Sequence, residues 1–307
     1  MSSNLSTTIV GIKLKNPLVL ASGIMGVSPA SLKMIENGGA GAVTMKSIGP
    51  TERHGNKNPT VFVWDHGLIN AVGLSNPGIN ASIPIFKEMQ KELSIPVFAS
   101  TFAGTVGEFV ANAEKFTTAG AQMLELNLSC PNTENDLGRM FALDIQKSVE
   151  VVTRVKKVVG TTKIFVKLTP DNADIVDVAK AVEAAGADGI TAVNTFSGLI
   201  IEPRVRRPIL SNKFGGLSGP AIKPVAVRAV YNIYKAVKIP IIGVGGVMSG
   251  LDAAEFIMAG ASAVGVGSAI YYRGIDVFKK ITDELSQFMQ EEGFKTIDEM
   301  KGVAHEN

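Results

Sequence analysis

The stretch Ala119-Gly120-Ala121-Gln122-Met123-Leu124 contains the pattern that decides the fold of this 307-residue chain. It predicts a helix that ends on a glycine, which adopts positive φ without strain, followed at once by an apolar strand. The pattern has three further copies: Asn37-Gly38-Gly39-Ala40-Gly41-Ala42-Val43, Ala185-Gly186-Ala187-Asp188-Gly189-Ile190 and Ala259-Gly260-Ala261-Ser262-Ala263-Val264. The chain is therefore expected to repeat a helix–strand unit along its length.

A second type of apolar strand alternates with these four. Its members are Asn16-Pro17-Leu18-Val19, Ile95-Pro96-Val97-Phe98, Lys163-Ile164-Phe165-Val166 and Ile239-Pro240-Ile241-Ile242. Three of them begin at proline, which a strand tolerates at its first residue. Eight nearly continuous apolar strands in four βαβα quarters predict a parallel sheet covered on both faces and closed into a (β/α)8 TIM barrel.

Helical periodicity fills the segments between the predicted strands. It predicts helices over 106–118, 141–159 and 175–185, and a helix whose apolar face contains Phe278, Ile281, Leu285 and Phe288. Residues 1–307 are expected to form a single domain, with long insertions at about 47–80, 129–140 and 195–219. Because each insertion follows a strand, all three belong to the carboxyl-terminal face of the barrel, where we expect them to cover a substrate rather than decorate the surface.

Composition and charge exclude several classes of function. Thirty Lys and Arg residues against 28 Asp and Glu residues leave a net charge of +2, too small for a protein that binds nucleic acid through bulk charge. The sequence has no apolar run of about 18 residues and no leader pattern, so we expect no membrane span and a cytoplasmic location. One cysteine excludes a disulfide within the chain, and three histidines make a metal centre unexpected.

Glycine clusters end the seventh and eighth predicted strands, in Gly243-Val244-Gly245-Gly246-Val247 and Gly265-Val266-Gly267-Ser268. Glycine lets backbone N–H groups approach an anion closely, and these two loops form the recurrent phosphate site of the TIM barrel. The same glycines would also suit tight turns. Neither cluster completes the G-x-G-x-x-G pattern, so a phosphate-bearing ligand is expected but a dinucleotide bound in Rossmann fashion is not.

Two lysines occur at predicted strand ends, Lys46 before Ser47 and Lys167 in the fifth strand. A lysine at this position directs its ammonium group into the barrel mouth, where it can neutralise an anion. The alternative is an ion pair with a carboxylate, although the sequence around Lys167 shows no partner. Two inward lysines favour a ligand that acquires negative charge during the reaction.

The only cysteine, Cys130, follows the fourth predicted strand directly. A lone cysteine is often an inert core residue. Here, however, asparagines are expected around it: Asn70, Asn127, Asn132 and Asn194, the last followed by Thr195. Since an amide offers a donor and an acceptor on one plane, this set predicts a heterocyclic amide substrate, with the thiol as nucleophile or proton acceptor.

Asn127-Leu128-Ser129-Cys130-Pro131-Asn132 resembles the signature of the dihydroorotate dehydrogenases, in their cysteine-dependent, non-membrane class. Further similar segments are Lys46-Ser47, Asn70-Ala71-Val72-Gly73-Leu74, Val193-Asn194-Thr195, Gly245-Gly246 and residues 215–224. The last of these is similar to the catalytic subunit of the heteromeric, NAD-linked subclass. The chain departs from the family at Ser100, where asparagine is common, and at Ser268, where threonine is common.

The resemblance implies a barrel that binds FMN and oxidises dihydroorotate to orotate. The FMN phosphate would lie on Gly245, Gly246, Gly267 and Ser268, and the ring and ribityl chain on Ser22, Lys46, Ser47, Ser100, Asn127, Lys167, Val193 and Gly219. Orotate would contact Lys46, Asn70, Ala71, Val72, Gly73, Leu74, Asn127, Asn132, Asn194 and Thr195. Cys130 would take the proton from C5 while hydride leaves C6 for flavin N5.

The resemblance also implies a homodimer joined to an FAD and 2Fe–2S electron-transfer subunit in a heterotetramer. The cluster is expected on that separate subunit, because one cysteine cannot ligate a cluster that needs four. Three alternatives stay open at this point. They are a dihydropyrimidine dehydrogenase subunit acting on uracil or thymine, a flavin-free phosphate-binding barrel and a non-catalytic subunit of a complex.

Overall fold

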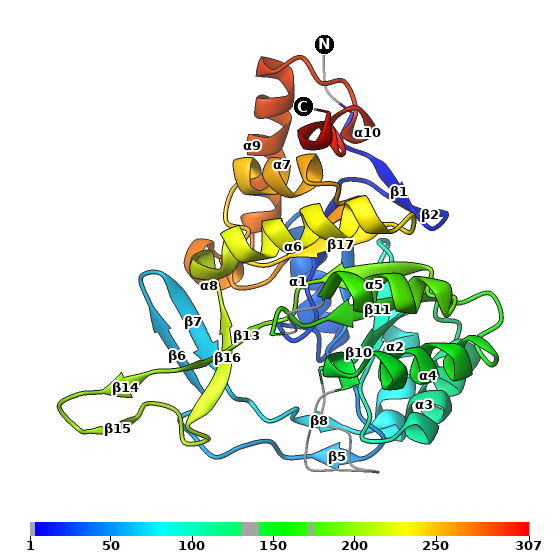
Figure 1. Ribbon diagram of the computed structural model, residues 1–307, viewed down its shortest axis with the longest axis vertical. Helices are drawn as coiled ribbons and strands as arrows, with labels where there is room; N and C mark the ends of the chain where they lie inside the picture. The colour runs from blue at the N-terminus through cyan, green and yellow to red at the C-terminus, as the bar shows by residue number, and fades with distance from the viewer. Residues whose placement is uncertain (1–3, 130–140, 172–174, 307) are drawn as a thin grey trace.

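Eight parallel strands close into a barrel in the computed structural model, which describes residues 4–129, 141–171 and 175–306 (Figure 1). In order around the barrel they are β3 (Leu18–Leu20), β4 (Ala42–Thr44), β9 (Val97–Thr101), β10 (Met123–Asn127), β11 (Lys163–Leu168), β12 (Gly189–Ala192), β17 (Ile241–Val244) and β18 (Ala263–Val266), which pairs back with β3. The predicted TIM barrel and its eight strands are confirmed.

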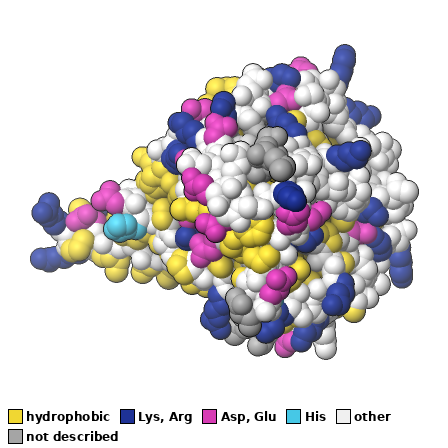
Figure 2. Space-filling model, turned by 90° about the horizontal axis from the view of Figure 1, so that it is seen from above, with side chains coloured by type: hydrophobic (Ala, Val, Ile, Leu, Met, Phe, Trp, Pro, Cys, Tyr) yellow, Lys and Arg dark blue, Asp and Glu magenta, His cyan; other side chains and the backbone are white. Residues whose placement is uncertain are grey.

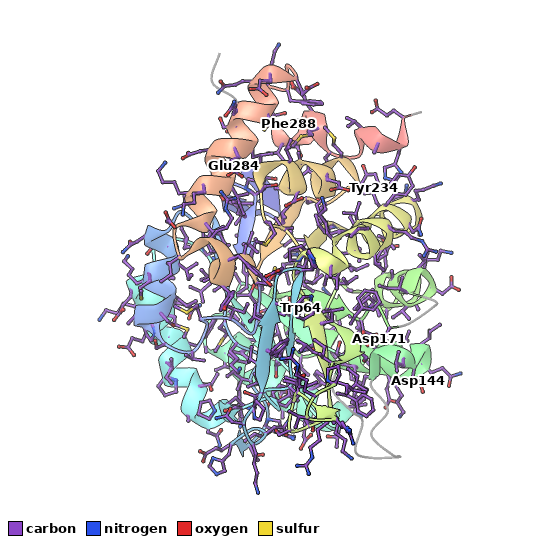
Figure 3. The ribbon with its side chains drawn as sticks, turned by 90° about the vertical axis from the view of Figure 1, so that its left-hand side faces the viewer. Trp64, Asp144, Asp171, Tyr234, Glu284 and Phe288 are labelled. Atoms are coloured by element: carbon purple, nitrogen blue, oxygen red, sulfur yellow. The ribbon has the colours of Figure 1, made fainter. Side chains whose placement is uncertain are left out.

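The outer helices are α1 (Pro29–Asn37), α2 (Ile79–Glu92), α3 (Val106–Thr118), α4 (Ile145–Lys156), α5 (Ile175–Ala184), α6 (Lys223–Ala236), α7 (Gly250–Met258), α8 (Ala269–Arg273), α9 (Val277–Glu291) and α10 (Ile297–Met300). Short 3-10 turns occupy η1 (Phe141–Leu143), η2 (Pro220–Ile222) and η3 (Val303–His305). The helix predicted over 106–118 is confirmed. The helix predicted over 141–159 is interrupted, because Asp144 lies at the start of α4 and its side chain accepts a hydrogen bond from the Lys147 backbone N–H (Figure 3).

The repeated glycine pattern has the backbone geometry that the sequence predicts. Gly39, Gly120, Gly186 and Gly260 end their helices with φ of 104°, 87°, 100° and 112°. A residue with a side chain would be strained at these angles, so glycine permits the chain to turn from each helix directly into the next strand.

The barrel interior is closed at its amino-terminal end and open at the other. A hairpin of β1 (Thr7–Ile9) and β2 (Ile12–Leu14) covers the closed end, where Ile9 and Leu14 pack with the buried side chains Phe98 and Phe165. A larger apolar core lies between the strands and the surrounding helices, and it includes Phe278, Ile281 and Leu285 of α9. Packing therefore leaves the carboxyl-terminal mouth of the barrel as the place for a ligand.

Two of the predicted insertions pair with each other above that mouth. The first forms β5 (Glu52–Arg53), β6 (Val61–Trp64), β7 (Gly67–Asn70) and β8 (Asn76–Pro77), and the second forms β13 (Phe196–Leu199), β14 (Ile201–Glu202), β15 (Arg207–Pro208) and β16 (Phe214–Ser218). Strands β13, β16, β7 and β6 make one antiparallel sheet, which with the β14–β15 ribbon projects from the barrel (Figures 1 and 2). Most of the third insertion, residues 130–140, lies outside the described residues.

Two features are absent from the described residues. No helix in them is both long and apolar enough to cross a membrane. Nor do residues 4–129, 141–171 and 175–306 contain a group of three or more His, Cys, Asp or Glu side chains placed to hold a metal ion.

Candidate active site

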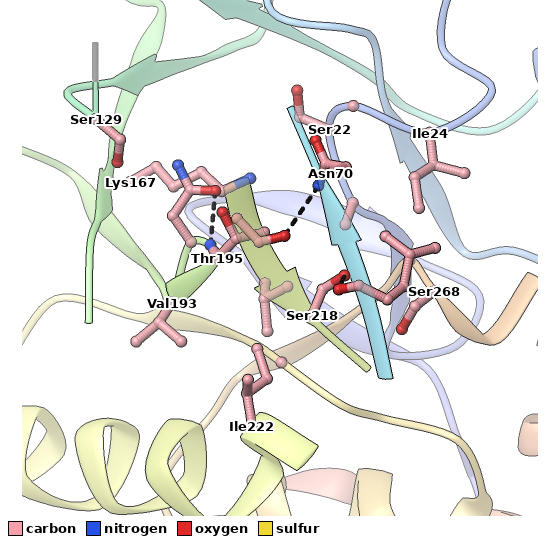
Figure 4. Close-up of a pocket in the computed structure, with 18 of the residues that line it drawn as sticks. Ser22, Ile24, Asn70, Ser129, Lys167, Val193, Thr195, Ser218, Ile222 and Ser268 are labelled. Atoms are coloured by element: carbon pink, nitrogen blue, oxygen red, sulfur yellow. Dashed lines mark hydrogen bonds between the residues drawn. The ribbon is translucent and has the colours of Figure 1, made fainter. Parts of the chain in front are cut away.

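A cavity of about 570 Å³ opens at the carboxyl-terminal end of the barrel, between the strand ends and the projecting sheet (Figure 4). Its volume lies within the usual range for a cofactor site. It is lined by most of the predicted site residues: Ser22, Lys46, Ser47, Asn70, Val72, Gly73, Leu74, Asn127, Lys167, Val193, Asn194, Thr195, Gly219, Gly245, Gly246, Gly267 and Ser268. Ala71 and Ser100 do not line it, and Cys130 and Asn132 lie outside the described residues.

One end of the cavity is made of the two glycine loops. Gly246 has a φ of 76°, and a Cβ there would lie 2.7 Å from the carbonyl oxygen of Gly219. Within the described residues, the backbone N–H groups of Gly246, Val247, Gly267 and Ser268 have no hydrogen-bond acceptor. Free amides on closely approaching backbone form a donor set that fits a phosphate group.

The loop between β17 and α7 is fixed from behind by ion pairs. Lys223 Nζ lies 2.7 Å from Asp252 Oδ1, and the other Asp252 oxygen accepts hydrogen bonds from the backbone N–H groups of Met248 and Ser249. Burial alone would raise the pKa of Asp252. The hydrogen bonds from Lys223, Met248 and Ser249 outweigh it and hold that pKa below its ordinary value. The loop that carries the free amides is therefore preorganised.

Lys46 brings a positive charge to the cavity wall. Its side chain is half-buried, and burial lowers the pKa of its ammonium group. In the described part of the chain no carboxylate lies within ion-pair distance of it. A desolvated lysine without a counterion has unused capacity for the carboxylate of a ligand.

Lys167 differs from Lys46, because the structure supplies the partner that the sequence did not show. Its Nζ atom lies 3.6 Å from Oε1 of Glu125, and both side chains are buried. Ser100 belongs to the same buried region. It is fully buried, donates to Glu125 Oε1 at 3.1 Å and lies 2.8 Å from the hydroxyl of Ser47, so its contacts are with the cavity wall rather than the cavity.

Three predicted asparagines are oriented by hydrogen bonds at the other end of the cavity (Figure 4). Asn194 Nδ2 donates to Asn127 Oδ1 at 3.3 Å, and Asn127 Nδ2 donates to Ser47 Oγ at 3.4 Å. Asn70 Nδ2 donates to the backbone oxygen of Gly216 at 3.3 Å, which ties the two insertions together. Fixed amides of this kind can recognise the alternating N–H and C=O groups of a cyclic imide.

Sequence reasoning missed two acidic residues of the site. Glu125 lies two residues before Asn127 in β10, and alternation along a strand puts both side chains on the same side. Asp171 lines the cavity three residues after β11 and accepts hydrogen bonds from the backbone N–H and the hydroxyl of Ser197. Its place beyond a strand end was a signal that could have identified it.

Comparison with known proteins agrees with this site. Residues 4–289 match the family model described as dihydroorotate dehydrogenase. The chain is 46% identical over 305 residues to a protein of Methanocaldococcus jannaschii, with 98% of each chain covered. It is 47% identical over 303 residues to one of Methanothermobacter thermautotrophicus and 44% over 300 residues to one of Pyrococcus abyssi, with 98% of this chain and 99% of each relative covered.

All three relatives are named dihydroorotate dehydrogenase B (NAD(+)), catalytic subunit. The match extends over nearly the whole length of both chains, so it includes the barrel, the glycine loops and the strand ends that carry the lysines and asparagines. The chain belongs to the dihydroorotate dehydrogenase family.

Proposed function

We propose that residues 1–307 act as one FMN-binding domain that oxidises dihydroorotate to orotate in pyrimidine biosynthesis. One observation carries this proposal: the same cavity contains, at the glycine loops, backbone donors that fit a phosphate group, and also Lys46 and three asparagine amides fixed by hydrogen bonds. The names of the relatives agree with it and do not favour a dihydropyrimidine dehydrogenase.

The cavity wall offers a place for each part of FMN. We assign the phosphate to the backbone amides of Gly246, Gly267 and Ser268, and to Gly245 beside them. Ser22, Ser47, Lys167, Val193 and Gly219 would hold the ring and the ribityl chain, and Ser100 would act from behind Ser47. When bound, FMN supplies the acceptor for the hydride that leaves C6 of dihydroorotate.

The substrate is assigned to the opposite end of the cavity. Lys46 would hold its carboxylate, since a half-buried ammonium group without a counterion gains most from an anionic ligand. Asn70, Asn127 and Asn194 would contact the ureide and imide groups, together with Thr195 and the loop from Ala71 to Leu74. Asn132 is assigned to the same set from its sequence position.

Cys130 is the proposed base that takes the proton from C5. That proton is only weakly acidic even beside a carbonyl group, so its removal needs a base held in place and shielded from water. Ser129, the residue directly before Cys130, lines the cavity and donates its backbone N–H to Asn127 Oδ1 at 3.2 Å. This hydrogen bond supports placing the following residue near the substrate amides.

The test is the rate of flavin reduction in a Cys130→Ala variant mixed anaerobically with dihydroorotate. The variant should still bind FMN and dihydroorotate, but reduction should slow by about 10²-fold or more because the base is missing. Cys130→Ser is the matched control for size and is expected to be slow as well. Reduction at the wild-type rate in both variants would contradict the role of Cys130.

We further propose that electrons leave through a separate FAD and 2Fe–2S subunit, in a heterotetramer with two copies of this chain. The relatives are named as NAD(+)-linked catalytic subunits. The projecting sheet and the β14–β15 ribbon beside it expose Leu199, Ile201, Val205 and Phe214, which offer apolar area for contact with another chain (Figure 2). We place the complex in the cytoplasm, where a lone cysteine stays a thiol.

NAD reduction tests the need for that subunit. The isolated chain should reduce its own flavin with dihydroorotate yet reduce NAD at a negligible rate, and addition of the electron-transfer subunit should restore NAD reduction. Rapid NAD reduction by the isolated chain would show that no such subunit is required.

A further inference from the structure

Glu125 is a buried acid that the proposed chemistry does not use. It lies in β10 two residues before Asn127, and its relative exposure is 3%. The only ion pair that either partner makes within the described residues joins Glu125 Oε1 to Lys167 Nζ, at 3.6 Å. A carboxylate this deep in the barrel is strongly destabilised unless charge and hydrogen bonds compensate for its lost hydration.

A continuous set of polar side chains supplies that compensation. Ser22 Oγ lies 3.0 Å from Ser47 Oγ, Ser47 Oγ lies 2.8 Å from Ser100 Oγ, and Ser100 Oγ donates to Glu125 Oε1. Ser22 and Ser47 lie just beyond the ends of β3 and β4, and Ser100 and Glu125 lie within the next two strands of the barrel, β9 and β10. Lys167 of β11 completes the arc. The arc ends on the only member with a positive charge.

The two residues of the pair differ in their position relative to the cavity. Lys167 lines the cavity, whereas Glu125 does not and lies behind it in the wall. A lysine alone would attract negative charge in the cavity strongly, because the surrounding wall has a low dielectric constant. A carboxylate behind the same lysine opposes that attraction, so the strength of the field in the cavity depends on Glu125 as well as on Lys167.

We propose that Glu125 is a positioning residue that acts through Lys167, holding the ammonium group at the cavity wall and limiting how far it favours the reduced, more negative flavin. This inference rests on the proposed FMN site. It assigns to Glu125 the task of keeping the midpoint potential of the flavin below the value that an unopposed Lys167 would give.

The experiment compares midpoint potentials of the FMN-loaded full chain, measured anaerobically against a reference dye at one fixed pH. Glu125→Gln removes the charge and keeps the size and an acceptor oxygen for Ser100. The matched control is Asp188→Asn. Asp188 lies at the amino-terminal end of the barrel. Its carboxylate lies 3.6 Å from Nζ of Lys163, which belongs to β11 as Lys167 does, and 2.6 Å from Nζ of Lys156.

Glu125→Gln should raise the equilibrium constant for two-electron reduction by about tenfold or more, which corresponds to about 30 mV. Asp188→Asn should leave the potential at the wild-type value. Equal potentials in wild type and Glu125→Gln would overturn the inference, as would an equal shift in Asp188→Asn. If Glu125→Gln does not fold, Glu125→Asp carries the test, because it keeps the charge but withdraws it by one methylene; a smaller rise supports the inference and no rise overturns it.

The same samples separate this inference from the proposed function. If wild-type protein does not bind FMN, or its flavin is not reduced by dihydroorotate, the proposed function fails. If wild-type flavin is reduced normally and the potential does not respond to Glu125, only the role of Glu125 fails.

Discussion

Arg273 and Glu284 enclose the end of the loop that follows β17. Arg273 Nη2 lies 2.5 Å from Glu284 Oε1, and Arg273 Nη1 donates to the backbone oxygen of Met248 at 2.6 Å. The second carboxylate oxygen of Glu284 accepts from the backbone N–H of Gly250 at 2.7 Å (Figure 3). One ion pair thus joins α8, α9 and the loop that carries Gly246.

Removal of the Arg273 side chain should weaken FMN binding. A hydrogen bond to a charged group contributes about 1.5–3 kcal/mol. Without the bonds from Arg273 the loop is held less firmly, and the Kd for FMN should rise by about tenfold in Arg273→Gln. The measurement is quenching of flavin fluorescence by apoprotein. Lys279→Gln is the control, because Lys279 pairs with Asp283 on the exposed face of α9, the helix that also carries Glu284. Equal affinities in wild type and Arg273→Gln would show that the pair does not order the loop.

The same ion pair should make stability depend on acid pH. The hydrogen bond from Arg273 lowers the pKa of Glu284 from its ordinary 4.5, against the opposing effect of burial. A carboxyl group whose pKa is lower in the folded state stabilises the fold above its ordinary pKa, and that stabilisation is lost as pH falls through the lowered value. The Tm should therefore fall less between pH 5 and pH 3 in Glu284→Gln than in wild type. Parallel curves of Tm against pH would contradict this assignment.

Replacement of Lys46 should separate charged from neutral ligands. Lys46→Met should raise the Kd for orotate by about 10–100-fold, the effect of one charge-assisted hydrogen bond, and leave the weak binding of neutral uracil unchanged. Because burial lowers the pKa of Lys46, orotate binding by wild type should also weaken as pH rises toward that lowered value. The two Kd values and the pH dependence of orotate binding can be measured from the change in the flavin spectrum as each ligand is titrated. Unchanged orotate affinity in Lys46→Met would remove Lys46 from the substrate site.

Asp171 should affect substrate binding through the insertion at 195–219. Its carboxylate holds Ser197, two residues after Thr195, by hydrogen bonds of 3.0 Å to the backbone N–H and 2.7 Å to the hydroxyl. Asp171→Ala should raise KM for dihydroorotate by about tenfold with a smaller change in kcat, since each hydrogen bond to a charged group contributes about 1.5–3 kcal/mol. Asp177→Asn, in an exposed pair with Lys180, is the control. A fall in kcat alone would point to another role.

The barrel could be predicted because its evidence is local. Prolines before strands, glycines after helices and periodic apolar residues each act over a few positions, and all eight strands followed from them. The break of the helix at Asp144 was missed because the apolar periodicity continues across it. Only the structure shows that the Asp144 side chain accepts a hydrogen bond from the Lys147 backbone N–H and so begins a new helix after the 3-10 turn.

The pairing of the two insertions could not be predicted in the same way. Gly216 pairs with Asn70 across 146 residues of sequence, and nothing local to either segment specifies that register. The Glu125–Lys167 pair lies between these cases. Alternation in Leu124-Glu125-Leu126-Asn127 puts Glu125 and Asn127 on one face, but only the closed barrel shows that Lys167 of the next strand lies beside them.

The visible absorption spectrum of the purified chain, recorded anaerobically before and after addition of dihydroorotate, tests the central claim most directly. The protein should show the spectrum of a bound, oxidised flavin, and dihydroorotate should bleach it while dihydrouracil leaves it largely unchanged. A colourless protein that does not take up FMN, or a flavin spectrum that dihydroorotate does not alter, would contradict the claim that this cavity oxidises dihydroorotate.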